Sequence, residues 1–79
     1  MPRILLIDDD SELAVPLRDY LSRYDLQLQA VAHPGQGLQQ IRLDPPDLLI
    51  LDIMLPEMYG FEVCRRIRRT SSLPIIMLT

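Results

Sequence analysis

Carboxylates directly follow two apolar runs of the chain. A run of four apolar residues leads into Asp8, Asp9 and Asp10, and a second run of four leads into Asp52. An acid that follows a buried strand is costly unless it is paired, because an uncompensated buried charge is strongly unfavourable. If the two runs are neighbouring strands, their backbones lie about 5 Å apart and their acids repel by roughly 3 kcal/mol at an effective dielectric constant near 20. A bound cation removes that repulsion, so the acids predict a metal site at a sheet edge.

Short apolar runs alternate with helix-like stretches, which is typical of βαβ units and a parallel sheet. We predict strands over residues 3–7, 26–31, 47–51 and 74–79, and helices that begin at Asp10 or Ser11, at Gly37 and at Gly60 or Phe61. Connections are right-handed and sequential strands usually lie side by side. With the first strand beside the third, the expected strand order is 2-1-3-4. This α/β arrangement, with three helices, is an incomplete flavodoxin-like (CheY-like) parallel sheet, because a complete one has a fifth strand.

Local sequence features predict the details of each of the three helices. Pro16 falls inside the first helix, where it removes one backbone hydrogen bond and should disturb the turn near Glu12. The segment from His33 to Gly35 should break the chain ahead of the second helix. In the third helix, we expect Phe61, Cys64 and Ile67 to be buried, with Val63 beside them.

Length and composition describe one small domain or part of one. The chain has 79 residues, of which 48% are hydrophobic, and this proportion indicates a packed core rather than disorder. Its net charge of −3 gives no electrostatic reason to expect nucleic-acid binding by this segment. No apolar run approaches the roughly 20 residues that cross a membrane, so we expect no membrane partner and a cytoplasmic location. The single Cys64 fits a reducing compartment.

Three segments, taken together, resemble the receiver domain of two-component response regulators. The first strand and acidic pair of that family are matched by ILLIDDD at residues 4–10. Its phosphoacceptor strand and following loop are matched by DLLILDIMLPEMYG at residues 47–60, and its fourth strand by IIMLT at residues 75–79. The resemblance covers the whole chain, and the joint spacing of the three segments is highly specific.

The resemblance implies a role for each residue at the strand ends. Asp52 matches the phosphoacceptor, and Thr79 matches the switch hydroxyl that donates a hydrogen bond to the phosphoryl group. Asp8, Asp9, Asp52 and the backbone carbonyl of Met54 match the family's Mg²⁺ ligands. Their chemistry is suitable, because Mg²⁺ takes octahedral oxygen ligands and often binds through one or two carboxylates.

The implied function is signalling rather than enzymatic catalysis. A sensor histidine kinase would transfer a phosphoryl group to Asp52 with Mg²⁺, and an output domain or partner protein would respond. The loop Asp-Ile-Met-Leu-Pro at 52–56 is similar to that of receivers in winged-helix transcription factors. Residues 1–79 correspond to the N-terminal two-thirds of a receiver. The family's lysine follows its fifth strand, and this chain contains no lysine.

Two other functions compete with this interpretation. A haloacid-dehalogenase-like phosphatase would use Asp8 as nucleophile and Asp10 as acid, but that family favours Thr or Val where this chain has Glu12. Alternatively, the chain is a non-switching interaction fragment. Its fourth strand would then be a bare edge, and the polypeptide would self-associate or swap elements with a second copy.

Structural roles are also open to several of these residues. Strand-end acids can be helix caps, and capping the first helix is the expected role of Asp10. His33 is expected to be a loop residue without function, and Cys64 a packing residue. A solvated helix face is expected for four arginines, whose charge suits the negative end of the helix dipole: Arg65, Arg66, Arg68 and Arg69.

Overall fold

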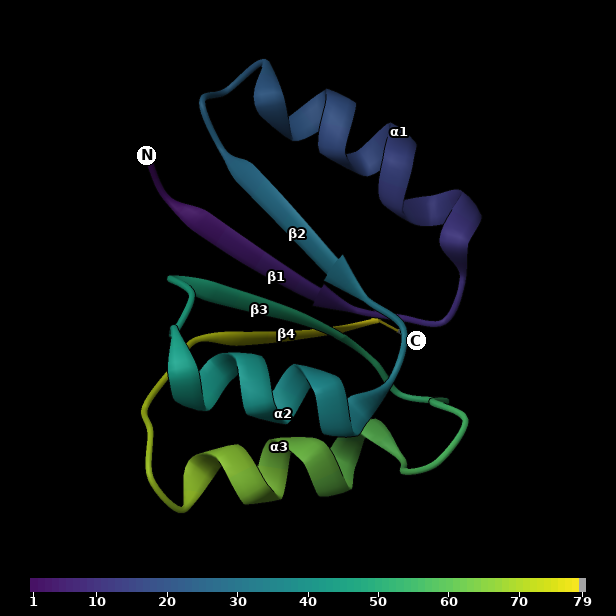
Figure 1. Cartoon of the computed structure of the whole chain (residues 1–79), viewed down its shortest axis with the longest axis vertical. Coiled ribbons are helices and arrows are strands. Elements are labelled where there is room, and N and C mark those ends of the chain that lie inside the picture. Colours follow the sequence, from purple (N-terminus) through teal and green to yellow (C-terminus); the bar gives the residue numbers. More distant parts are fainter. Residues whose placement is uncertain (79) are drawn as a thin grey trace.

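A parallel four-stranded sheet forms the middle layer of the molecule, which we describe from a computed structural model over residues 1–78 (Figure 1). Helix α1 covers one face of the sheet, and α2 and α3 lie side by side on the other. The predicted strand order is confirmed as β2-β1-β3-β4. The elements are β1 (Arg3–Ile7), α1 (Ser11–Ser22), β2 (Gln27–Val31), α2 (Pro34–Leu43), β3 (Leu48–Asp52), α3 (Gly60–Arg68) and β4 (Ile75–Leu78).

The two interior strands form the centre of two apolar cores. Ile4 to Ile7 of β1 are all buried, which suits a strand covered on both sides. Alternate residues of β1 and β3 face α2 and α3, where they pack with Val63 and Ile67. The residues between them in β1 and β3 point to the other face of the sheet. There they form the second core, against which Leu17 of α1 packs. Burial on both sides therefore holds β1 and β3 next to each other, and this pairing positions the acids that follow them.

The start of the sheet is held by polar contacts of Arg3. Its backbone N–H donates to the Asp47 carboxylate over 2.7 Å, and its guanidinium donates to the Pro45 carbonyl over 2.7 Å and to the Asp44 carboxylate. These bonds tie the loop before β3 to the first residue of β1. The same loop therefore sets where β3 begins beside β1.

Two predictions about the helices are wrong. Helix α2 begins at Pro34 instead of Gly37, because proline at the first helical position needs no backbone N–H and has a suitable φ angle. Phe61 is 64% exposed rather than buried. The buried face of α3 consists of Gly60, Val63 and Ile67, three and four residues apart, and Phe61 lies about 100° away from Gly60 around the helix.

The first helix follows its predicted cap. Asp10 is its N-cap, and the Asp10 carboxylate accepts a hydrogen bond from the Glu12 backbone N–H over 3.0 Å. The helix continues through Pro16 to Ser22. Among residues 1–78, no helix has both the length and the apolar character that crossing a membrane requires.

Candidate metal and phosphoacceptor site

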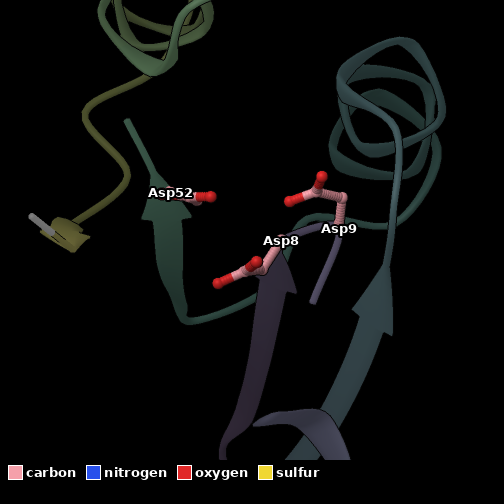
Figure 2. Close-up of side chains that lie close together, drawn as sticks. All are labelled: Asp8, Asp9 and Asp52. Carbon is pink, nitrogen blue, oxygen red and sulfur yellow. The ribbon is translucent and has the colours of Figure 1, made fainter. Parts of the chain in front are cut away.

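The strand pairing places the acids of two distant segments at one edge of the sheet. Ile7 pairs with Leu51 in the β1–β3 ladder, so Asp8 and Asp52 each come one residue after that pair. One carboxylate oxygen of Asp8, one of Asp9 and one of Asp52 all lie within 4.8 Å of one another. Figure 2 shows this group at the tips of β1 and β3, with the carboxylates of Asp9 and Asp52 directed toward each other. The sequence prediction that these three acids converge is confirmed.

Burial and neighbouring carboxylates disfavour the ionised form of Asp8. Burial raises the pKa of the Asp8 carboxyl above its ordinary value, and the carboxylates of Asp52, Asp10 and Asp9 raise it further. The Asp10 backbone N–H opposes this by donating a hydrogen bond of 2.9 Å to the Asp8 carboxylate. Because neighbouring carboxylates contribute to the shift of this pKa, a cation between them would favour the ionised form.

The donor set suits a hard divalent cation. Three carboxylates supply oxygen ligands only, which Mg²⁺ prefers, and Asp9 is exposed while Asp8 and Asp52 are half-buried. This arrangement leaves an open side where waters or a phosphoryl oxygen can complete an octahedral shell. The residues therefore fit Mg²⁺ on both charge and ligand type.

The loop after β3 is held close to the strand end. The Met54 backbone N–H donates to the Asp52 carboxylate over 3.3 Å, and the Gly60 backbone N–H donates to the Ile53 carbonyl over 2.7 Å. Leu55 is only 7% exposed and anchors the loop in the core, whereas the Met54 side chain is 66% exposed. Met54 therefore meets the site through its backbone.

Gly60 is required by this close approach. A Cβ at this position would contact the backbone carbonyl oxygen of Asp52 and would lie 2.9 Å from the Ile53 Cα. Backbone atoms cannot move aside as a flexible side chain can. The start of α3 therefore packs directly against the backbone of Asp52, the residue at the centre of the site.

Comparison with known families decides the class of this site. The family model described as the response regulator receiver domain matches residues 4–79. The chain belongs to this family. The match favours the receiver interpretation over the phosphatase alternative, and the contact between Asp10 and the α1 backbone agrees, because it gives Asp10 a capping role.

Curated relatives and solved structures resemble this receiver chain over nearly all of its length. The transcriptional regulatory proteins AfsQ1 of Streptomyces coelicolor and BaeR of Escherichia coli are 49% and 44% identical over 100% and 99% of the chain. The chain spans 35% and 32% of their lengths. The BeF3-activated N-terminal receiver domain of Klebsiella pneumoniae RstA is 32% identical, with a TM-score of 0.91 over 98% of this chain and 66% of that one.

Two further residues show the limits of sequence reasoning. Thr79, the predicted switch hydroxyl, lies outside the described residues. His33 is expected to be a loop residue without function. Its ring nitrogen Nδ1 lies 2.6 Å from the Glu57 carboxylate, and this contact connects the loop before α2 to the loop before α3. Both side chains are more than half exposed, and such surface pairs contribute little to stability. No sequence pattern marks this pair, because its members are 24 residues apart in separate loops.

Proposed function

We propose that Asp52 of this receiver accepts a phosphoryl group from a phosphohistidine of a sensor histidine kinase. The observation that carries the proposal is the convergence of Asp8, Asp9 and Asp52, with one oxygen of each within 4.8 Å of the others. The responding output would be transcriptional, since AfsQ1 and BaeR are transcriptional regulatory proteins. Residues 1–79 would form the N-terminal two-thirds of the receiver, in agreement with the 66% coverage of the RstA receiver.

The proposed transfer is a substitution at phosphorus. A carboxylate oxygen of Asp52 attacks the phosphorus and forms a P–O bond while the P–N bond to the kinase histidine breaks. The electron pair of that bond stays on the imidazole nitrogen, which then takes a proton. The partly exposed carboxylate of Asp52 lies at an open strand end, where a donor can approach it in line.

The remaining residues would bind the metal and hold the product. Asp8, Asp9, Asp52 and the Met54 backbone carbonyl would hold Mg²⁺, whose positive charge offsets the charge that develops on the phosphoryl oxygens. The Thr79 hydroxyl would donate a hydrogen bond to the new phosphoryl group, which adds a charge of about −1.5 to −2.

Phosphorylation by a small donor tests this assignment without the kinase. The chain is incubated with acetyl phosphate and Mg²⁺, and the added phosphate is measured by intact-mass spectrometry. We expect one hydroxylamine-labile phosphoryl group, as an acyl phosphate requires, on the wild-type chain and none on Asp52→Asn. Label that survives in Asp52→Asn but disappears in Asp8→Asn would contradict the proposal and support the phosphatase-like nucleophile instead.

A second proposed property, self-association, is favoured by the contrast between the two sheet edges. Edge strand β2 presents the exposed polar side chains of Gln27 and Gln29. Edge strand β4 consists only of apolar residues, and its Ile76 is 51% exposed. Within residues 1–78, β4 pairs only with β3, so its other side offers unpaired backbone groups to a second strand. We propose that the 79-residue polypeptide pairs with a second copy through β4.

A further inference from the structure

A groove between α2 and α3 lies at the end of the sheet opposite the acids. Helices α2 and α3 both begin near the strand ends that carry Asp8 and Asp52. Their C-terminal ends therefore lie where the strands begin (Figure 1). The groove has a volume of about 460 Å³. Leu38, Ile41 and Ile67 form its floor, and Arg42 and Arg66 border it. This combination of an apolar floor and a cationic border has no part in the proposed phosphoacceptor chemistry.

The two arginines have charge available for a partner. None of the ion pairs among residues 1–78 involves the Arg42 guanidinium. Arg66 shares the Glu62 carboxylate with Arg65, which donates to both Glu62 oxygens over 2.9 and 2.6 Å, whereas Arg66 reaches one of them only at 3.3 Å. Glu62 is therefore paired chiefly with Arg65, and Arg66 makes the longer contact with it through Nε alone.

The distribution of charge over the molecule indicates that a partner at the groove is negatively charged. The net charge of the chain is −3, and Asp8, Asp9 and Asp52 lie together at one end of the sheet. At the groove end, the carboxylates of Asp44 and Asp47 accept hydrogen bonds from Arg3. An acidic partner is repelled from the end that carries Asp8 and attracted by the arginines at the groove end. Complementary charge of this kind orients a partner during encounter more than it adds to affinity.

The apolar floor of the groove favours a protein partner over a nucleic acid. Ile41 and Ile67 are 8% and 4% exposed, and with Leu38 they offer an apolar surface to a side chain. A nucleic acid would bring phosphates and no aliphatic side chain, and the net negative charge of the protein would oppose its approach. We propose that the groove binds an acidic amphipathic segment of a partner protein, with an aliphatic side chain on the floor and carboxylates on Arg42 and Arg66. This inference does not depend on the proposed phosphotransfer.

Binding of a designed probe peptide tests the inference. The probe is a short fluorescent peptide that alternates Glu with Leu, and its binding to the full 79-residue chain is followed by fluorescence anisotropy. Two matched peptides carry Lys in place of every Glu, or Ser in place of every Leu. We expect the Glu–Leu peptide to bind at least about tenfold more tightly than either matched peptide. Equal binding of the Ser-containing peptide, or no saturable binding of the Glu–Leu peptide, would overturn the proposal.

Charge reversal locates the binding surface. In the double variant Arg42→Glu/Arg66→Glu, we expect the affinity for the Glu–Leu peptide to fall by about tenfold or more, because each reversal replaces an attraction by a repulsion. The control Arg23→Glu makes one such reversal, half the charge change of the double variant, at an exposed position outside the groove and should leave most of the affinity in place. An equal loss in Arg23→Glu would show a non-specific charge effect and overturn the proposal. So would tighter binding of a DNA oligonucleotide that the double variant abolishes.

Discussion

Asp8 and Asp52 are 44 positions apart in the chain, yet their carboxylate oxygens lie within 4.8 Å of each other. The parallel pairing of Ile7 with Leu51 accounts for this proximity, because each acid follows directly after a member of that pair. A shift of one residue in the register would move one acid to the other face of the sheet. The buried residues of β1 and β3 thus determine the geometry of the site.

Replacing Asp8 should stabilise the metal-free protein and remove its response to Mg²⁺. Asp8→Asn removes a half-buried charge beside two other carboxylates while its amide oxygen can still accept from the Asp10 N–H. We expect the free energy of unfolding without metal to rise by up to about 1 kcal/mol. Wild-type protein should gain about 1.4 kcal/mol when Mg²⁺ is at ten times its Kd, and Asp8→Asn should gain almost nothing. Thermal melting with and without Mg²⁺ measures both effects.

Asp10→Asn is the matched control for the loss of charge. It removes one negative charge from the same loop, but asparagine also caps a helix well, so α1 should be retained. We expect Asp10→Asn to keep the stabilisation by Mg²⁺. Loss of that response in Asp10→Asn would show that the effect in Asp8→Asn comes from overall charge rather than from a metal ligand.

The stability of the metal-free protein should depend on pH through Asp8. The folded-state pKa of Asp8 is raised above its ordinary value of 3.8, so the folded protein binds more protons than the unfolded chain in the window above that value. Protonated Asp8 therefore stabilises the folded protein relative to the unfolded chain, and this stabilisation is lost as the pH rises through the window. Urea unfolding between about pH 4 and pH 7 should show a decline that is smaller in Asp8→Asn. An identical pH profile in the two proteins would contradict the raised pKa.

Gly60→Ala should disturb the site through the backbone. The added Cβ would press against the Asp52 carbonyl and lie 2.9 Å from the Ile53 Cα, so the loop or the start of α3 must shift. We expect a loss of about 1–3 kcal/mol in the free energy of unfolding, together with slower phosphorylation by acetyl phosphate. Gly35→Ala is the control, because a Cβ there meets nothing within 4 Å, and it should be neutral or stabilising by up to about 1 kcal/mol. Equal losses in the two variants would refute this packing argument.

Self-association should depend on the apolar edge strand. Ile76→Lys places a charge at the exposed centre of β4, which disfavours pairing with a second strand. In sedimentation experiments we expect the wild-type polypeptide to dimerise or aggregate and Ile76→Lys to shift toward monomer. Gln27→Lys on the opposite edge is the control and should leave the association unchanged. A monomeric wild-type polypeptide that unfolds cooperatively would exclude self-association.

The parts of the molecule that follow from short-range patterns were predictable from sequence. The apolar runs before Asp8 and Asp52 identify strands, and the flavodoxin-like order 2-1-3-4, in which the first strand lies beside the third, brings the two acids together. Asp10 was predictable as a cap because its side chain and the Glu12 N–H are close in sequence. Each of these features depends on neighbours along the chain or on one strand pairing.

Features that depend on three-dimensional packing were not predictable in the same way. Phe61 fits a helical apolar pattern, but α3 buries the face that contains Val63 and Ile67 instead. Leu55 belongs to a loop, where periodicity gives no signal, yet it lies in the core. The close approach of Gly60 to Asp52 likewise requires the loop path between them. In each case, the deciding contact joins elements whose relative position no local pattern specifies.

Locating the phosphoryl group within the chain tests the central claim most directly. After reaction with acetyl phosphate and Mg²⁺, borohydride reduction converts a phosphorylated aspartate into homoserine, and peptide mass spectrometry then identifies the modified position. Our account predicts modification at Asp52 that requires Mg²⁺ and is absent without the phosphate donor. Modification at Asp8 or Asp9 with Asp52 unchanged would contradict it.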